Sequence, residues 1–144
     1  PVHKFPTIGE YEVMLVAESS NDCTDTTTRI ITVRNEFSFY FPTSFTPNGD
    51  GMNDCARPCG NGIDKSDFSL VIYDRWGNLV FQTDRFDPEA PCDACTAGSW
   101  DGTKNGSRIK GDEILPNGMY HWYAEFKDWN GIVFKEQGTI TLIR

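Results

Sequence analysis

The chain is organised around one loop-forming stretch, which reads Phe41-Pro42-Thr43-Ser44-Phe45-Thr46-Pro47-Asn48-Gly49-Asp50-Gly51-Met52-Asn53-Asp54. Its two prolines fix φ and exclude a helix, and its two glycines permit a left-handed backbone. Its Asn and Asp side chains are typical of turns, because they bond to nearby backbone groups. We therefore expect a loop here, with the end of one module before it and a complete module after it.

The oxygen-bearing side chains of this loop have a spacing that is typical of hard-cation sites. Asn48, Asp50, Asn53 and Asp54 place their oxygen atoms at short intervals, so the loop is a candidate structural calcium site. Only two of the four are carboxylates, and neither the terminal Glu nor the helices of an EF-hand are present. The alternative is a capped turn in which these side chains bond to their own backbone. The sequence leaves both interpretations open.

The acidic composition excludes several classes of partner. The 144 residues include 13 Lys and Arg against 21 Asp and Glu, which gives a net charge of −8 and a pI near 4.6. Such a chain repels the phosphates of nucleic acid and the surface of an anionic membrane. It also has no apolar run of about 18 residues, so we expect no direct membrane insertion. An acidic protein outside the cell, in contact with divalent cations, fits this composition better.

The residue pattern predicts an all-β fold with almost no helix. Aromatic residues make up 13% of the chain, glycine and proline are frequent, and the apolar positions alternate with a period of two. One face of the strand after Gly118 carries Tyr120, Trp122, Ala124 and Phe126, and the chain ends on a further strand. The predicted strands are residues 7–18, 27–33, 37–41, 68–73, 79–83, 119–127 and 132–143.

Four of the five cysteines form two close pairs, Cys55 with Cys59 and Cys92 with Cys95. Four thiolates at these spacings would suit tetrahedral zinc. An acidic, turn-rich β protein is typical of export, where oxidation to disulfides is the usual state. We favour disulfides, and a crossed pairing would fasten two long loops together, but four cysteines allow three pairings. Cys23 has no partner among these four.

The first 34 residues contain two predicted strands, which are too few for a domain. The sequence Gly9-Glu10-Tyr11-Glu12-Val13-Met14-Leu15-Val16-Ala17-Glu18-Ser19, followed by Cys23 and a β-branched run to Val33, resembles the last strands of PKD-type immunoglobulin-like repeats. Such repeats stand in tandem in bacterial surface proteins. We therefore divide the chain into residues 1–34, the end of a PKD-like repeat, a polar linker at 35–36, and a second module at 37–144.

The second module carries five motifs in order. The Phe41–Asp54 stretch is followed by Leu70-Val71-Ile72-Tyr73-Asp74-Arg75-Trp76-Gly77-Asn78-Leu79-Val80-Phe81, by Trp100-Asp101-Gly102-Thr103, by Leu115-Pro116-Asn117-Gly118-Met119-Tyr120 and by Gly138-Thr139-Ile140-Thr141-Leu142-Ile143-Arg144. This set resembles the gliding-motility-associated C-terminal domain, the type B sorting domain of the type IX secretion system of Bacteroidota. The two cysteine-containing segments, around 55–59 and 92–95, depart from the usual pattern of that family.

The resemblance implies an immunoglobulin-like β-sandwich with a sorting function. Domains of this family close large secreted proteins such as adhesins and direct them across the outer membrane. They are received at the cell surface by a β-barrel protein of the PorP/SprF kind, so the resemblance implies a secreted, outer-membrane-associated protein. Since an exposed strand edge can add to a partner's sheet, we expect the last strand to bind this partner. Its residues are Thr139, Ile140, Thr141, Leu142, Ile143 and Arg144.

Two other classes of function are alternatives to sorting. A carbohydrate- or matrix-binding module would use aromatic side chains as a platform, for example Trp76, Trp100, Trp122 and Trp129, and calcium as an orienting ion. An enzyme would need a nucleophile, a base and an oxyanion donor, or a pair of carboxylates drawn from Asp74, Glu125 and Asp128. His3 and His121 are not near a candidate nucleophile in the sequence. We therefore expect no catalytic residues.

Overall fold

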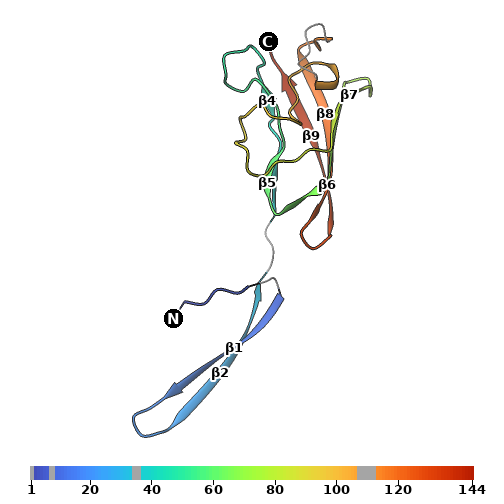
Figure 1. Ribbon diagram of the computed structural model, residues 1–144. Helices are drawn as coiled ribbons and strands as arrows, with labels where there is room; N and C mark the ends of the chain where they lie inside the picture. Colours follow the sequence, from blue (N-terminus) through green and yellow to red (C-terminus); the bar gives the residue numbers. More distant parts are fainter. Residues whose placement is uncertain (1, 7–8, 34–36, 107–112) are drawn as a thin grey trace. The chain divides into compact units, whose positions relative to one another are not determined.

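The computed structural model describes residues 2–6, 9–33, 37–106 and 113–144. The chain forms two compact units, Pro1–Glu36 and Phe37–Arg144, and each is described by itself (Figure 1). The predicted linker at 35–36 lies outside the described residues, as do residues 7–8 at the start of the first predicted strand. In the described part of the chain, no helix has the length and apolar character needed to cross a membrane.

The first unit is a long antiparallel hairpin. Strand β1 (Gly9–Glu18) pairs with β2 (Thr24–Val33) along its whole length, from Gly9 opposite Val33 to Glu18 opposite Thr24. Alternation of apolar and polar residues and the β-branched run explain why both segments are extended. Large apolar side chains remain exposed on both faces, including Leu15 at 62% and Ile30 at 66%. This two-stranded sheet therefore lacks a core of its own.

The second unit is a sandwich of two sheets. The larger sheet has the strand order β4-β9-β8-β6-β7, with β4 (Ser44–Phe45), β6 (Ile63–Tyr73), β7 (Leu79–Thr83), β8 (Gly118–Asp128) and β9 (Val133–Leu142). The smaller sheet pairs β3 (Ser38–Tyr40) with β5 (Cys59–Asn61). Within the described residues, the one helical element is a short 3-10 turn, η1 (Lys104–Gly106). The predicted all-β sandwich is confirmed.

The core lies between these sheets and is rich in aromatic rings. The face of β8 predicted from its alternation, Tyr120, Trp122, Ala124 and Phe126, is buried, and the β9 residues Ile140 and Leu142 are buried beside it. From the opposite sheet, the Phe39 ring lies 5.0 Å from that of Phe126 and 5.8 Å from that of Trp122. Burial of this apolar surface is the main force that holds the two layers together.

The strand that enters the sandwich changes from one sheet to the other at Pro42. Before it, β3 pairs with β5, and after it, β4 runs parallel to β9 with Ser44 opposite Thr141. Proline has no N–H to donate and disfavours a continuous ladder, so the crossing between the sheets falls at this residue. Phe41 and Phe45, on either side, are both buried. The sequence pattern did not predict the short strands β4 and β5.

Candidate functional site

The five sequence motifs converge at one end of the sandwich, which we call the motif end. It comprises the loop at 46–54, the β6–β7 turn at 74–78, the segments 100–103 and 115–118, and the chain end at 143–144. Figure 1 shows the C-terminus, the loop after β4 and the start of β8 at this same end. Residues separated by up to about 100 positions in the sequence therefore form one continuous surface.

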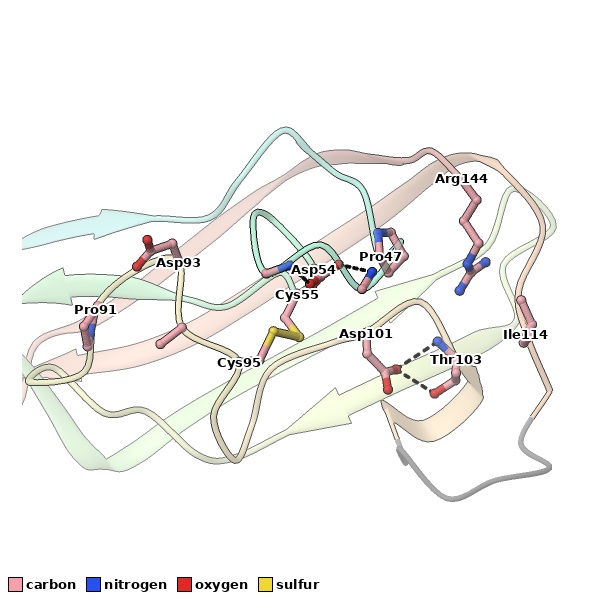
Figure 2. A pocket seen from close by; sticks show the side chains of 13 residues that line it. Pro47, Asp54, Cys55, Pro91, Asp93, Cys95, Asp101, Thr103, Ile114 and Arg144 are labelled. Atoms are coloured by element: carbon pink, nitrogen blue, oxygen red, sulfur yellow. Dashed lines mark hydrogen bonds between the residues drawn. A yellow bond between two sulfur atoms is a disulfide. The ribbon is translucent and has the colours of Figure 1, made fainter.

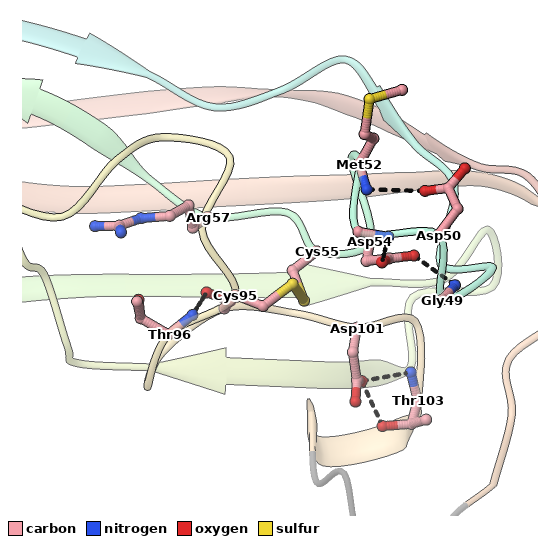
Figure 3. Close-up of a disulfide and its surroundings, with 12 residues drawn as sticks. Gly49, Asp50, Met52, Asp54, Cys55, Arg57, Cys95, Thr96, Asp101 and Thr103 are labelled. Atoms are coloured by element: carbon pink, nitrogen blue, oxygen red, sulfur yellow. Dashed lines mark hydrogen bonds between the residues drawn. A yellow bond between two sulfur atoms is a disulfide. The ribbon is translucent and has the colours of Figure 1, made fainter.

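The loop from Thr46 to Asp54 is held by its own polar side chains. The two carboxylate oxygens of Asp54 accept hydrogen bonds from the amides of Gly49 (2.7 Å) and Gly51 (2.8 Å). Asp50 accepts from the Met52 amide at 2.8 Å (Figure 3). Asn48 Oδ1 accepts from the Asp50 amide at 2.9 Å. Gly49 has φ 82° and Gly51 has φ 87°, values that favour glycine. These hydrogen bonds and the two glycines together define the backbone of the loop.

This arrangement is the capped turn that was the alternative to a calcium site. The oxygens of Asn48, Asp50 and Asp54 each accept a hydrogen bond from the loop's own backbone, and Asn53 adopts a positive φ of 53°. Among the described residues, no group of three or more His, Cys, Asp and Glu side chains is placed to hold a metal ion. Calcium binding at the loop stays a prediction, and the hydrogen bonds account for the loop's residue types without it.

The Trp100-Asp101-Gly102-Thr103 motif forms the floor of the motif end. Trp100 is completely buried, and its ring lies 5.0 Å from that of Phe45 and 5.1 Å from that of Tyr120. Its indole Nε1 donates to the Thr103 carbonyl at 3.0 Å. The Asp101 carboxylate accepts from both the amide and the hydroxyl of Thr103. The aromatic residue therefore anchors the core, while Asp101 shapes the turn.

The last residue fastens three of the motifs together. The Arg144 guanidinium donates to the carbonyl of Leu115 at 2.7 Å and to that of Gly102 at 3.1 Å. The Arg144 carbonyl accepts from the side-chain amide of Asn117 at 3.2 Å. At Gly102, a Cβ atom would lie 2.6 Å from Leu142 and 2.8 Å from the Arg144 guanidinium, which explains why this position has no side chain. No pattern in the sequence predicts this role for Arg144.

Two further contacts complete the motif end. The Tyr120 hydroxyl donates to the Pro116 carbonyl at 2.7 Å, and burial of the phenol raises the pKa of Tyr120. In the β6–β7 turn, the Asp74 carboxylate accepts from the amides of Trp76 and Asn78 and from the Asn78 side chain. The Asn78 side chain is the main reason that the pKa of Asp74 is lowered. These groups stabilise the turns and do not form a reactive pair.

The four paired cysteines form two disulfides in the crossed arrangement. Cys55 bonds to Cys95, with Cα atoms 5.4 Å apart (Figure 3). Cys59 bonds to Cys92, with Cα atoms 5.7 Å apart. The zinc alternative is therefore wrong in this structure, because all four sulfurs are bonded in pairs. Cys23, on the hairpin, is free and exposed. The disulfides hold the long segment after β7 against residues 55–59, which lead into β5 and include its first residue.

Arg57 adds a polar clamp between the two disulfides. It is buried, and its guanidinium donates to the carbonyls of Asp87 (2.5 Å) and Pro91 (3.0 Å). Nearby, Ala56 and Trp100 exchange two backbone hydrogen bonds, both at 2.8 Å. Arg57 lies outside the five sequence motifs. The one feature of the sequence that could have identified it is its position between Cys55 and Cys59. If this segment is buried, a basic side chain there must find hydrogen-bond acceptors.

An open depression of about 730 Å³ lies between the loop and the disulfide segment (Figure 2). Pro47, Asp54 and Cys55 line one side, and Asp101 and Thr103 line the other. Figure 2 shows that the Asp101 carboxylate turns back to Thr103, and the Asp54 carboxylate turns back to its own loop. The Asp54 and Asp101 carboxylates are thus used in holding the turns.

A family model described as the CHU_C type IX secretion signal domain matches residues 39–142, more than two thirds of the chain. The chain belongs to this family. The match begins at β3 and ends at the last residue of β9, so it covers the whole sandwich and leaves the hairpin outside. The sorting family inferred from the five motifs is confirmed, while the PKD-like character of the hairpin stays a prediction.

The chain also has distant likenesses among solved structures. CopC from Methylosinus trichosporium OB3b is 12% identical with a TM-score of 0.43, and the match covers 73% of this chain and 93% of that one. Dimeric latent PorU from Porphyromonas gingivalis is 15% identical with a TM-score of 0.42, and the match covers 95% of this chain and 12% of that one. A tetra-tandem repeat in the extending region of a large adhesion protein is 15% identical with a TM-score of 0.37, and the match covers 94% of this chain and 32% of that one. No curated protein matches the chain. The family assignment rests on the family model alone.

The last strand of the signal domain is part of its core. Of the residues predicted to bind a partner, Ile140 and Leu142 are buried, and Thr139, Ile143 and Arg144 are exposed. The amides of Thr141 and Ile143 already donate to the carbonyls of Thr43 and Phe45. Strand β4 therefore occupies this end of the β9 edge.

The other candidate residues of the signal domain do not gather into a site. Trp100 and Trp122 are in the core, whereas Trp76 and Trp129 lie in turns at opposite ends of the larger sheet. Asp74 and Asp128 also belong to turns at opposite ends, and each accepts hydrogen bonds from its own turn. His121 is exposed on the outer face of β8 opposite Tyr73, and His3 belongs to the first unit. The structure thus builds neither the tryptophan platform nor a carboxylate pair.

Proposed function

We propose that residues 37–144 are the sorting signal of a large secreted, adhesin-like protein. The signal directs that protein through the type IX secretion machinery and then docks it on an outer-membrane β-barrel protein of the PorP/SprF kind. The observation that carries this proposal is the family match over residues 39–142. The described structure adds that the motifs behind the match, remote in sequence, are fastened to one another at the motif end.

The contacts of the chain end favour recognition of the signal through the surface of the folded domain. The chain end contributes two core side chains, Ile140 and Leu142, and its Arg144 guanidinium holds Leu115 and Gly102. A linear peptide signal would have no need for such contacts. We therefore propose that the machinery recognises the assembled sandwich, and that the domain itself carries out no chemical reaction.

The hairpin belongs to the passenger side of this proposal. Its exposed apolar residues, such as Leu15, Val16 and Ile30, need a second layer to be buried. We propose that β1 and β2 are the last strands of a PKD-like repeat, whose other strands would cover them. In this proposal the boundary after residue 36 separates the passenger's repeats from the signal.

Deletion of residues 137–144 tests the proposed function. In a host with a type IX secretion system, we expect the shortened protein to remain in the periplasm, and fractionation with surface protease treatment measures this. Because the deletion also removes core residues, Ile72→Ala is the matched control, since it weakens the buried core of β6 and leaves the chain end in place. Surface display of the shortened protein would contradict the proposal.

Purification of the native full-length protein after cross-linking tests the docking step. We expect an outer-membrane β-barrel protein to copurify with the wild type and not with the shortened chain. A polysaccharide array, with and without a chelator, tests the rival binding function on the same protein. Saturable, chelator-sensitive sugar binding without a barrel partner would favour a carbohydrate-binding module instead.

A further inference from the structure

The two edges of the five-stranded sheet differ in how they are covered. At one edge, η1 packs on β7, and a Cβ at Gly106 would lie 2.3 Å from the Phe81 ring. At the other edge, β4 pairs with β9 only at Thr141 and Leu142. Over Val133–Thr139, no described strand pairs with β9 on the side away from β8. This stretch is called the open edge below.

The direction of the backbone groups at the open edge follows from the strand's alternation. The amides of Thr141 and Ile143 point toward β4, where they donate to Thr43 and Phe45. The register of β9 against β8 is continuous from Leu142 to Val133, so residues of the same parity point the same way. The N–H and C=O groups of Val133, Lys135, Gln137 and Thr139 therefore face outward. They present an unused ladder about 20 Å long.

A single charge sits at an inward-facing position of this edge. Residues of even number in β9 face the core, because Ile140 and Leu142 are buried, and Glu136 lies among them opposite Ala124. Glu136 is nevertheless exposed, and neither an ion pair nor a hydrogen bond of its side chain occurs within the described residues. Its neighbour Gly138 has no side chain because a Cβ would lie 2.7 Å from the Trp122 ring. The edge is thus flat at Gly138 and acidic at Glu136.

An inward-pointing charge protects an edge strand from indiscriminate pairing. Two copies of this chain paired through the open edge would bring two Glu136 carboxylates near each other, in a protein whose net charge is already −8. A strand with a Lys or Arg opposite Glu136 would instead pair the charge. The edge therefore selects against a second copy and in favour of a basic partner.

We propose that the open edge binds an extended segment of a partner protein as an added strand, collinear with β4, with a cationic side chain opposite Glu136. This inference rests on the proposed function, because the partner segment would belong to the machinery or barrel that receives the signal. It moves the recognition surface from Thr139–Arg144, where β4 already covers the strand, to Val133–Thr139.

The test uses the whole 144-residue chain behind a secreted fluorescent reporter, in a host with a type IX secretion system. Gln137→Pro removes one outward N–H and leaves the bonds to β8, and Glu136→Lys reverses the charge. We expect each variant to lower the surface fraction about tenfold or more, Gln137→Pro because proline cannot donate to the added strand and Glu136→Lys because like charges then face each other across the pairing. Glu89→Lys, an exposed loop change of the same charge, should display like the wild type. Thermal unfolding confirms that each variant is folded.

Site-specific photocross-linking in the same cells locates the contact. A photoreactive residue at Lys135 should yield an adduct with an extended, Lys- or Arg-containing segment of a partner, and Glu136→Lys should abolish it. A residue at Gln82, in β7, should yield none. Display of wild type and both variants at equal levels would overturn this inference alone, as would a cross-linked dimer of the chain. Failure of the wild type to reach the surface would instead overturn the proposed function.

Discussion

The hairpin and the sandwich are built from the same alternation of apolar and polar residues, but they differ in how far the apolar side chains are buried. In β1, Leu15 follows the alternation and is 62% exposed, whereas in β8, Trp122 follows it and is buried. The difference is the second layer, because β3 and β5 cover the inner face of the larger sheet, whereas the described residues of the first unit contain no strand besides β1 and β2. Alternation specifies a strand, and burial requires an opposing sheet.

The sandwich and the hairpin that precedes it also differ in the contacts that stabilise them. The sandwich holds its fold with a core, two disulfides and the Arg144 contacts. The first unit has the pairing hydrogen bonds of the hairpin and the ring contacts of Phe5 with His3 at 4.9 Å and with Tyr11 at 4.7 Å. We therefore expect substitutions in the sandwich to have large effects on stability, and equivalent substitutions in the hairpin to have small ones.

The largest expected effect follows from the buried indole. Trp100→Ala should lower the free energy of unfolding by about 3–5 kcal/mol, since it leaves a cavity between Phe45 and Tyr120. Trp76→Ala, at a side chain that is 72% exposed, should change it by less than about 0.5 kcal/mol. Urea unfolding followed by circular dichroism measures both. Similar losses for the two variants would show that Trp100 is not a core residue.

The second effect concerns the cross-links. Replacing Cys55 and Cys95 together by Ala should lower the free energy of unfolding by about 2–4 kcal/mol, since the bond closes a loop of 40 residues. Cys23→Ala, in the hairpin, removes a free thiol and should leave stability unchanged. Peptide mapping without reduction checks the pairing directly. A Cys55–Cys59 or Cys55–Cys92 peptide would contradict the crossed arrangement.

A smaller effect depends on pH and on the β6–β7 turn. Because the pKa of Asp74 is lowered below its ordinary value of 3.8, the ionised carboxylate stabilises the fold above that pH. This contribution is lost as the pH falls through the lowered pKa. Asp74→Asn should therefore melt at a lower temperature than the wild type at neutral pH, and the gap should close on acidification. A gap independent of pH would indicate that the charge has no role.

The smallest effect is expected in the hairpin. Leu15→Ala should change the free energy of unfolding of the 144-residue chain by less than about 0.5 kcal/mol, because the side chain is mostly exposed. The same substitution in the native full-length protein sharpens the comparison. If further strands of a PKD-like repeat cover β1, the loss should rise to about 2–5 kcal/mol there. An equally small loss in both proteins would contradict the proposed repeat.

Much of the fold was predictable because local patterns specify it. The alternation in β8 and β9 identified the buried faces, and the prolines and glycines of the loop identified its backbone. The two-residue strand β4 and the three-residue strand β5 were missed, because their pairing depends on β9 and β3, which are remote in sequence. Strands so short carry no periodicity of their own.

The sequence identified the motifs that form the site, but it did not predict the contacts between them. Pro47, Trp100 and Arg144 were each identified in a motif, but their convergence depends on the tertiary fold. The crossed disulfides could not be chosen from spacing, since three pairings were possible. Arg57 and Glu136 were not singled out, because a lone charge in a sequence usually marks a solvated surface. Only the structure shows that one is buried and the other stands on an inward face.

Comparison of the two regions in a transport assay tests the central claim most directly. One secreted fluorescent reporter is followed by the whole chain, residues 1–144, and a second is followed by the hairpin alone, residues 1–36. In a host with a type IX secretion system, protease applied to intact cells measures the surface fraction. We expect the first reporter at the cell surface and the second in the periplasm. Retention of the first reporter in the periplasm, or equal display of both, would contradict the assignment of the sorting signal to the sandwich.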